Sequence, residues 1–225
     1  MTLYKINDIF YSLQCEGVAT GQPAVFIRFS GCNLKCSFCD TDFSEYQKMS
    51  AEEIVLHVKK ILSEETLKKP HWRFVLTGGE PTLQIDAPLL NNLREEFGEE
   101  RVIQIETNAT TLAEKYDMLD GCFFTASPKN GKGLDSLRKY FSAHKDDENN
   151  SIEVKAVFDE KNNCLRIFLG ILEEIVPSNV PLSIQPCDYQ NVEKNKLNIE
   201  KCIKFVKDNP RWRLSLQTQK LLNIK

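Results

Sequence analysis

Apolar segments of strand length alternate with helix-like segments along most of this chain. The strand-like segments cover residues 4–14, 24–29, 72–76, 102–106, 122–126, 152–158, 182–184 and 212–216. Helical periodicity with an apolar stripe covers residues 50–62, 89–97, 165–176 and 192–206, and the first of these begins with a capping box at Ser50 and Glu53. The alternation predicts an α/β domain with a mostly parallel sheet and right-handed crossovers, although the units are too few for a complete eight-unit barrel.

Polar motifs follow the predicted strands at the points where the strands end. They are the cysteine-rich loop after residues 24–29, and then residues 77–80, 107–108, 127–129 and 185–188. Each motif is weak alone, and the glycines at 78 and 79 also fit a tight strand-to-helix turn. Because the carboxyl ends of parallel strands meet at one rim, where α/β folds bind ligands, their common position predicts a binding site there.

Cys32, Cys36 and Cys39 form a C-x3-C-x2-C motif directly after an apolar strand. Thiolates at this spacing suit an iron–sulfur cluster or zinc. A closed zinc site has four ligands, but the nearest histidine is His57 and no fourth cysteine stands nearby. A cubane with three protein ligands, which leaves one iron open, is therefore predicted. Zinc with a distant fourth ligand, and cysteines without a ligand role, are the alternatives.

Length and composition fit one domain over residues 1–225 in a reducing compartment. The chain has 225 residues, 41% hydrophobic and 27% charged, which favours neither disorder nor a membrane protein. A net charge of −3 gives no overall attraction to nucleic acid. The N-terminus does not resemble a signal peptide, so we expect a cytoplasmic protein with reduced thiols. The remaining cysteines are scattered and interpreted as packing residues: Cys15, Cys122, Cys164, Cys187 and Cys202.

Arg28 is the one charged residue in the strand-like segment 24–29. It fits an edge position that points to water. It equally fits a guanidinium directed at an anion near the cysteine loop. Both interpretations stay open.

Several stretches resemble the 7-carboxy-7-deazaguanine synthases, a family of radical S-adenosylmethionine (SAM) enzymes. The cysteine motif and Gly-Gly-Glu-Pro at residues 78–81 are typical of the whole superfamily. Cys-Asp-Thr-Asp-Phe at residues 39–43 and Leu-Ser-Leu-Gln-Thr at residues 214–218 are more specific, and residues 10–17, 23–32 and 127–129 match as well. The resemblance covers nearly the whole chain. It implies an α/β fold that forms an incomplete TIM-like barrel of mostly parallel strands, with the cofactor site at the carboxyl-terminal rim.

The resemblance implies a lyase that converts 6-carboxy-5,6,7,8-tetrahydropterin to 7-carboxy-7-deazaguanine, with ring contraction and loss of ammonia, in queuosine or other deazapurine biosynthesis. The implied cofactors are a 4Fe–4S cluster, SAM and Mg²⁺. The implied partners are the small-molecule substrate, a low-potential electron donor such as flavodoxin or ferredoxin, and a second copy in a homodimer, without nucleic acid or membrane. No side chain is assigned a catalytic role, because the cluster and SAM carry the chemistry.

The resemblance also assigns residues. The cluster ligands are Cys32, Cys36 and Cys39, and Thr41 is the Mg²⁺ ligand. Cofactor contacts come from Phe38, Cys39, Asp40, Gly79, Ser127, Pro128, Lys129, Gln185, Pro186, Cys187 and Asp188. Substrate contacts come from Leu13, Gln14, Cys15, Arg28, Thr77 and Lys225. We also expect residues 217–225 to fold back over the site.

The chain departs from the family pattern at a few positions. Cys15 and Ala109 replace glycines, Gln219 replaces a common histidine, and the chain ends in Asn-Ile-Lys rather than Gly-Ile-Pro. These changes bear on substrate contacts and leave the cluster assignment intact. Two other functions are considered: an activase that installs a glycyl radical on a partner protein, and a non-enzymatic iron–sulfur or zinc protein.

Overall fold

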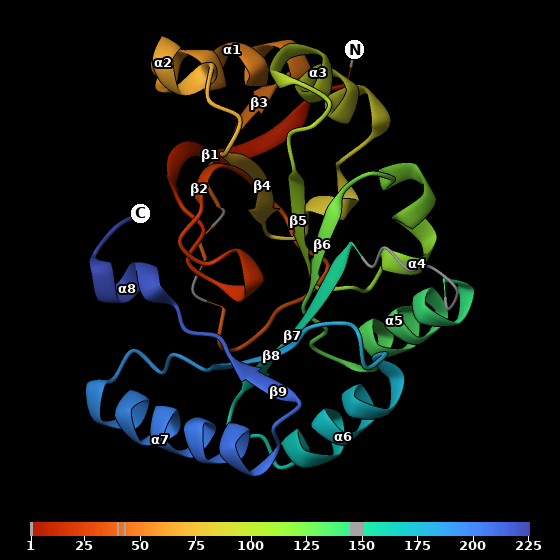
Figure 1. Cartoon of the computed structure of the whole chain (residues 1–225), viewed down its shortest axis with the longest axis vertical. Coiled ribbons are helices and arrows are strands. Elements are labelled where there is room, and N and C mark those ends of the chain that lie inside the picture. The colour runs from red at the N-terminus through yellow and green to blue at the C-terminus, as the bar shows by residue number, and fades with distance from the viewer. Residues whose placement is uncertain (1, 40, 43, 145–150) are drawn as a thin grey trace.

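The strands form one open, mostly parallel sheet. The computed structural model describes residues 2–39, 41–42, 44–144 and 151–225. In this part of the chain a nine-stranded sheet has the order β3-β1-β2-β4-β5-β6-β7-β8-β9 (Figure 1). The strands are β1 (Tyr4–Leu13), β2 (Pro23–Phe29), β3 (Gln47–Met49), β4 (Arg73–Gly78), β5 (Ile103–Thr107), β6 (Phe123–Ala126), β7 (Ile152–Phe158), β8 (Leu182–Pro186) and β9 (Trp212–Leu214). β1 pairs antiparallel with β2 and β3, and the other pairs are parallel. Because β3 and β9 are free edges, the predicted incomplete barrel is confirmed.

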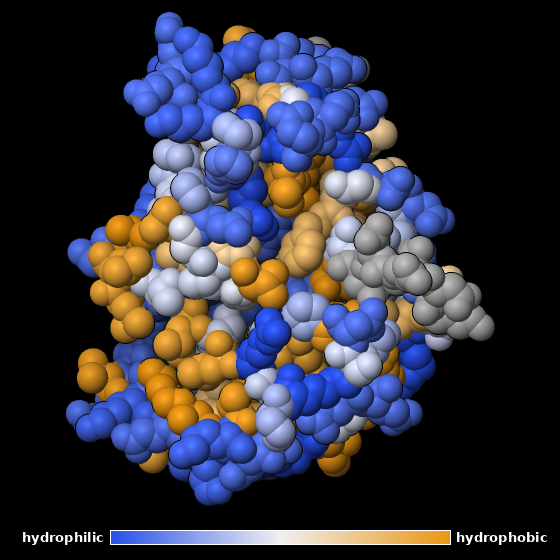
Figure 2. All heavy atoms as spheres, in the orientation of Figure 1, coloured by the Kyte–Doolittle hydropathy of each residue, from blue (hydrophilic) through white to orange (hydrophobic). Residues whose placement is uncertain are grey.

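The helices lie on the outer side of the curved sheet, except for α8, which lies at its open side (Figure 1). They are α1 (Ala51–Ile61), α2 (Glu64–Leu67), α3 (Ala87–Phe97), α4 (Leu112–Lys115), α5 (Gly131–Ala143), α6 (Leu165–Ile175), α7 (Val192–Asp208) and α8 (Thr218–Leu222), with short 3-10 turns η1 (Gly17–Ala19), η2 (Pro81–Leu83) and η3 (Tyr116–Leu119). The predicted capping box of α1 is present, because the Ser50 hydroxyl accepts from the Glu53 amide and the Glu53 carboxylate accepts from the Ser50 amide. Hydrophilic residues dominate the surface of α1, α2 and α3 in Figure 2. In the part of the chain that is described, no helix has the length and apolar character needed to cross a membrane.

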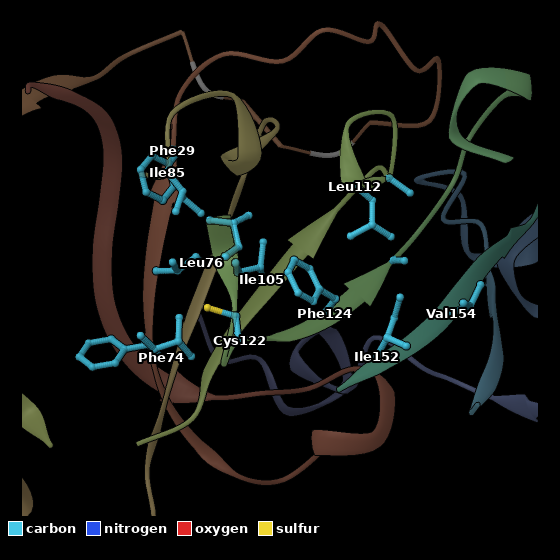
Figure 3. Packing of buried hydrophobic residues seen from close by; sticks show 14 of the residues in the cluster. Phe29, Phe74, Leu76, Ile85, Ile105, Leu112, Cys122, Phe124, Ile152 and Val154 are labelled. Atoms are coloured by element: carbon cyan, nitrogen blue, oxygen red, sulfur yellow. The ribbon is translucent and has the colours of Figure 1, made fainter. Parts of the chain in front are cut away.

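The two faces of the sheet differ in polarity. Successive residues of a strand point to opposite faces. The outer face carries the main core, in which Leu76, Ile105 and Phe124 from neighbouring strands pack together under the helices (Figure 3). The inner face is largely polar, and the strand register places Arg28 beside Thr77. In the same way, further polar residues of β5, β6 and β7 are register neighbours on the inner face: Glu106, Thr125 and Glu153. A parallel sheet with a polar inner face is prepared to bind a polar ligand.

The sequence patterns did not predict α2, α4, α5, α8 or β3. Asn130 caps α5 by accepting from the Gly133 amide, but the glycines at 131 and 133 have low helix propensity. The large apolar side chains that α5 buries begin at Leu134 and continue through Phe141. Tertiary packing of that stripe therefore decides the helix. The helices and strands that were predicted are all present, with ends that differ by a few residues.

Candidate active site

One pocket lies at the carboxyl ends of the parallel strands, with a volume of about 380 Å³. Almost every site residue expected from the sequence lines it: Leu13, Gln14, Cys15, Arg28, Cys32, Cys36, Phe38, Cys39, Thr41, Thr77, Gly79, Ser127, Lys129, Gln185, Pro186, Cys187, Asp188 and Lys225. The fold thus places motifs that are up to about two hundred residues apart in the sequence around one pocket. Pro128 is buried and does not line the pocket, and Asp40 lies outside the described residues.

Backbone packing at the end of β4 places the cysteine loop over this rim. The Gly79 amide donates to the Phe29 carbonyl at 3.0 Å, and the Glu80 amide donates to the Gly31 carbonyl at 2.9 Å. A Cβ atom on Gly79 would lie 2.0 Å from the Gly31 oxygen. Glycine is therefore required where the two segments touch. The paired glycines also end β4 in a turn that leads into η2, which confirms the strand-to-helix turn.

The three cysteines of the loop all line the pocket. All are free thiols, with Cys32 and Cys36 partly buried and Cys39 exposed. The Leu34 amide donates to the Cys32 sulfur at 3.4 Å. Burial raises the pKa of Cys36, although the nearby Lys129 charge opposes that rise.

The three thiols line one pocket and do not form a compact single-metal site among the described residues. Among the described side chains, no three His, Cys, Asp or Glu residues lie close enough together to hold one metal ion. The three thiols stand along the wall of one pocket instead. Three thiols on one loop are soft donors of the kind that an iron–sulfur cluster takes.

Charged and aromatic groups next to the thiols fit SAM, which carries an ammonium, a carboxylate and a purine. The Lys129 ammonium contacts the Ser127 hydroxyl and lies 5.9 Å from the centre of the Phe38 ring. Burial and the Lys155 charge lower the pKa of Lys129 to about 8. A second hollow, of about 360 Å³, continues past Phe38 and Cys39, and also includes Cys187 and Asp188.

The floor of the pocket is a polar network that the sequence analysis did not foresee. Glu106 on β5 accepts from the Thr77 hydroxyl at 2.8 Å and from the Gln14 amide at 3.1 Å. Below it, Arg73, Gln104, Thr125 and Glu153 form a chain of side-chain hydrogen bonds across four strands. The sequence contained a signal for this network, because Gln104 and Glu106 occupy alternate positions of β5. Polar residues at such positions are uncommon in a central parallel strand with both faces covered.

Glu16 and Lys155 form a buried ion pair at the edge of the pocket, with only 15% and 8% of their side chains exposed. The Gln217 and Gln219 side-chain amides each donate to the second Glu16 oxygen at 3.2 Å. Burial by itself would raise the pKa of Glu16, but the Lys155 charge and these hydrogen bonds outweigh burial and lower the pKa to about 2. Glu16 thus joins η1, β7 and the carboxyl-terminal segment.

Arg28 lies on the inner face of β2 and lines the pocket. It is half-buried, with its guanidinium carbon 5.5 Å from the centre of the Phe10 ring. Of the two interpretations of this strand arginine, the structure therefore supports the one directed at the site.

The carboxyl-terminal residues fold back over the pocket, as expected. The Thr218 hydroxyl donates to the Cys15 carbonyl at 3.0 Å, and the Ser12 hydroxyl donates to the Lys225 carbonyl at 2.5 Å. The Lys225 ammonium lies 2.5 Å from an oxygen of Asp8. These contacts hold the segment against β1.

Deleting residues 222–225 is expected to raise the KM for substrate several-fold and to lower the melting temperature only slightly. The deletion removes Lys225 from the pocket wall, whereas most side chains lost are exposed. Steady-state kinetics and thermal unfolding test this. Leu221→Ala, at a side chain that is 74% exposed, is the control and should match the parent. Parent-like kinetics after the deletion would show that these residues only pack against β1.

The fold and the thiol triad together define a class of protein. Residues 26–127 match the Radical SAM superfamily. The structure resembles the crystal structure of QueE from Escherichia coli, with a TM-score of 0.61, 23% sequence identity and coverage of 95% of this chain and 93% of that chain. An incomplete α/β barrel with three free cysteines at its rim fits this superfamily, which implies a 4Fe–4S cluster and SAM as cofactors.

Relatives narrow the class to one family. The chain is 40% identical to the 7-carboxy-7-deazaguanine synthase of Bacteroides thetaiotaomicron, over 98% of both chains. It is 33% identical to the synthase of Bradyrhizobium diazoefficiens over 99% of both chains, and 32% identical to that of Rickettsia prowazekii over 99% of this chain and 89% of the relative. The chain belongs to the 7-carboxy-7-deazaguanine synthase family. This membership decides against the activase and the non-enzymatic alternatives.

Proposed function

We propose that this protein converts 6-carboxy-5,6,7,8-tetrahydropterin to 7-carboxy-7-deazaguanine, with ring contraction and release of ammonia. The relatives are named as this synthase, and they align with this chain over nearly their full length. In this chain, the main support is that one pocket contains the cysteine triad, Arg28 and the Glu106 network together.

The cofactors would lie at the cysteine side of the pocket. Cys32, Cys36 and Cys39 would hold the cluster, and Phe38, Lys129 and the rim residues 185–188 would cradle SAM. With both bound, the cofactors supply the radical chemistry that begins with removal of a substrate hydrogen.

The chain's own residues would bind and orient the substrate. The Arg28 guanidinium can pair with its carboxylate through two parallel hydrogen bonds. Glu106 can accept hydrogen bonds from N–H groups of the pterin. Thr77 and Gln14 hold the Glu106 carboxylate in place. The Gln219 amide oxygen is buried and has no hydrogen-bond partner among the described residues, so it can accept from another N–H group. The stacked rings of Phe10 and Phe26, 4.9 Å apart, form the apolar wall.

The decisive experiment follows one hydrogen atom. Substrate deuterated at C6 is incubated anaerobically with the reconstituted protein, SAM, Mg²⁺ and a low-potential reductant. We expect 7-carboxy-7-deazaguanine to form and deuterium to appear in 5′-deoxyadenosine by mass spectrometry. A loaded, reducible cluster with no deuterium transfer would show that the substrate is wrong.

Thr41 is the proposed Mg²⁺ ligand, because it lines the pocket next to Cys39 and carries a hard hydroxyl oxygen. Thr41→Ala is expected to weaken the stimulation of turnover by Mg²⁺ about tenfold, which corresponds to one lost ligand worth about 1.4 kcal/mol. The cluster absorbance should not change. Thr41→Ser keeps the hydroxyl and is the control. An alanine variant that responds to Mg²⁺ like the parent would move the site elsewhere, with Asp42 the next residue to test.

Other parts of the proposal concern organisation. A single radical SAM domain over residues 1–225 is supported by the one sheet that runs from β1 to β9. A flavodoxin or ferredoxin as electron donor, a homodimer and a cytoplasmic location remain predictions, and the reduced thiols support the last.

A further inference from the structure

Three side chains clamp the cysteine loop to the end of β5. Asn108 Nδ2 donates to Asn33 Oδ1 at 2.9 Å, Asn33 Nδ2 donates to Thr110 Oγ1 at 2.8 Å, and Thr110 Oγ1 donates to Asn108 Oδ1 at 2.6 Å. The three bonds close a ring. Because Asn33 directly follows Cys32, this ring fixes the start of the loop to a strand of the central sheet.

Asn108 is itself held rigidly. It is 8% exposed, and its backbone amide donates to a Glu80 oxygen at 2.7 Å. The other Glu80 oxygen accepts from the Thr107 hydroxyl at 2.7 Å. Glu80 belongs to the Gly-Gly-Glu-Pro motif, and it lies buried beneath the rim rather than in the pocket wall. The motif thus supports the residue that holds the loop.

The orientation of the Asn108 amide group follows from its partners. The backbone N–H of Thr110 lies 3.0 Å from Asn108 Oδ1, and a backbone N–H can only donate. That side-chain atom must therefore be the oxygen, and the NH₂ group must face the cysteine loop. One of its hydrogens serves Asn33. The other is available to the Cys32 sulfur, which lies 3.8 Å from Nδ2.

Hydrogen bonds to cysteine sulfurs help to set the reduction potential of an iron–sulfur cluster. A donor stabilises the more negative reduced state, so it raises the potential. We propose that Asn108 is a positioning residue that holds the Cys32 end of the loop and raises the potential of the cluster through its amide hydrogen. The inference rests on the proposed role of Cys32 as a cluster ligand.

The test is the midpoint potential of the reconstituted protein, measured without SAM by a redox titration followed by electron paramagnetic resonance. Asn108→Ser removes the amide without adding charge. At a fixed potential, the ratio of reduced to oxidised cluster should fall about tenfold, which is a decrease of about 59 mV for one electron. Iron and sulfide per chain should stay at the parent level.

Asn198→Ser is the matched control. Asn198 is 2% exposed, and its amide donates to the Phe158 and Cys187 carbonyls at 3.0 and 3.1 Å rather than to the cysteine loop. The substitution removes an equally buried amide, and the potential should match the parent.

The outcomes separate this inference from the proposed function. A loaded Asn108→Ser protein with the parent potential would overturn the inference alone. A parent protein that takes up no cluster would overturn both. If Asn108→Ser does not fold, Thr110→Val decides, because it opens the ring at the hydroxyl and keeps the backbone donor. It should lose iron to a chelator several-fold faster than the parent, and an unchanged rate would overturn the clamp.

Discussion

Replacing Cys36 by alanine is expected to give a folded protein without a 4Fe–4S cluster and with product formation at background level. The cluster needs three protein thiolates, and two cannot hold it while one iron is left open for SAM. The same loss is expected for Cys32→Ala and Cys39→Ala. Iron and sulfide analysis, the brown absorbance and the turnover assay measure it.

Cys187→Ala is the control for that series. Cys187 lines the same pocket, but it follows β8 and does not belong to the cysteine loop. It should retain the cluster. If Cys187→Ala lost its cluster as completely as Cys36→Ala, the assignment of the ligands to the loop alone would be wrong.

Replacing Lys155 by methionine is expected to lower the free energy of unfolding by about 3–5 kcal/mol, the usual cost of removing one partner of a buried ion pair. Methionine preserves most of the volume, so the loss arises from the Glu16 carboxylate left buried without its cation. Urea unfolding at pH 7 measures this. Because the pKa of Glu16 is lowered to about 2, its stabilisation is fully present above pH 4.5 and is lost only as the pH falls towards 2.

The double variant Glu16→Gln/Lys155→Met separates charge from packing. It leaves no uncompensated charge, so it should recover most of the lost stability. A double variant as unstable as Lys155→Met alone would show that packing of the lysine stem, and not the ion pair, is what stabilises this edge of the pocket.

The sequence predicted the rim of the site well and its floor poorly. The rim residues, such as Gly79 and Lys129, follow strand ends, and the topology of a parallel sheet brings strand ends together. Glu106 and Lys155 lie inside strands, where a charged residue also fits a solvent-exposed face. Only the curvature of the sheet shows that this face surrounds a pocket.

The partners of Glu16 could not be predicted from the sequence either. Gln217 and Gln219 lie about two hundred residues further along the chain, and no local pattern indicates such a contact. The same holds for the clamp of Asn33, because it depends on the register of β5 against the cysteine loop. Sequence periodicity therefore predicted the fold. Which polar side chains meet across long sequence distances could be seen only in the structure.

The contacts of Glu16 with Lys155, Gln217 and Gln219 have a consequence for biosynthesis. While the ribosome extends the polypeptide, Glu16 is made early, but Lys155 and then Gln217 and Gln219 emerge much later. Until they arrive, the η1 segment lacks the contacts that bury it, and contacts so distant in sequence form slowly. The part of the pocket wall that Gln217 and Gln219 form can therefore be completed only after β9 has been made. Slow synthesis of residues 155–219 should prolong the period in which a chaperone or protease can reach η1.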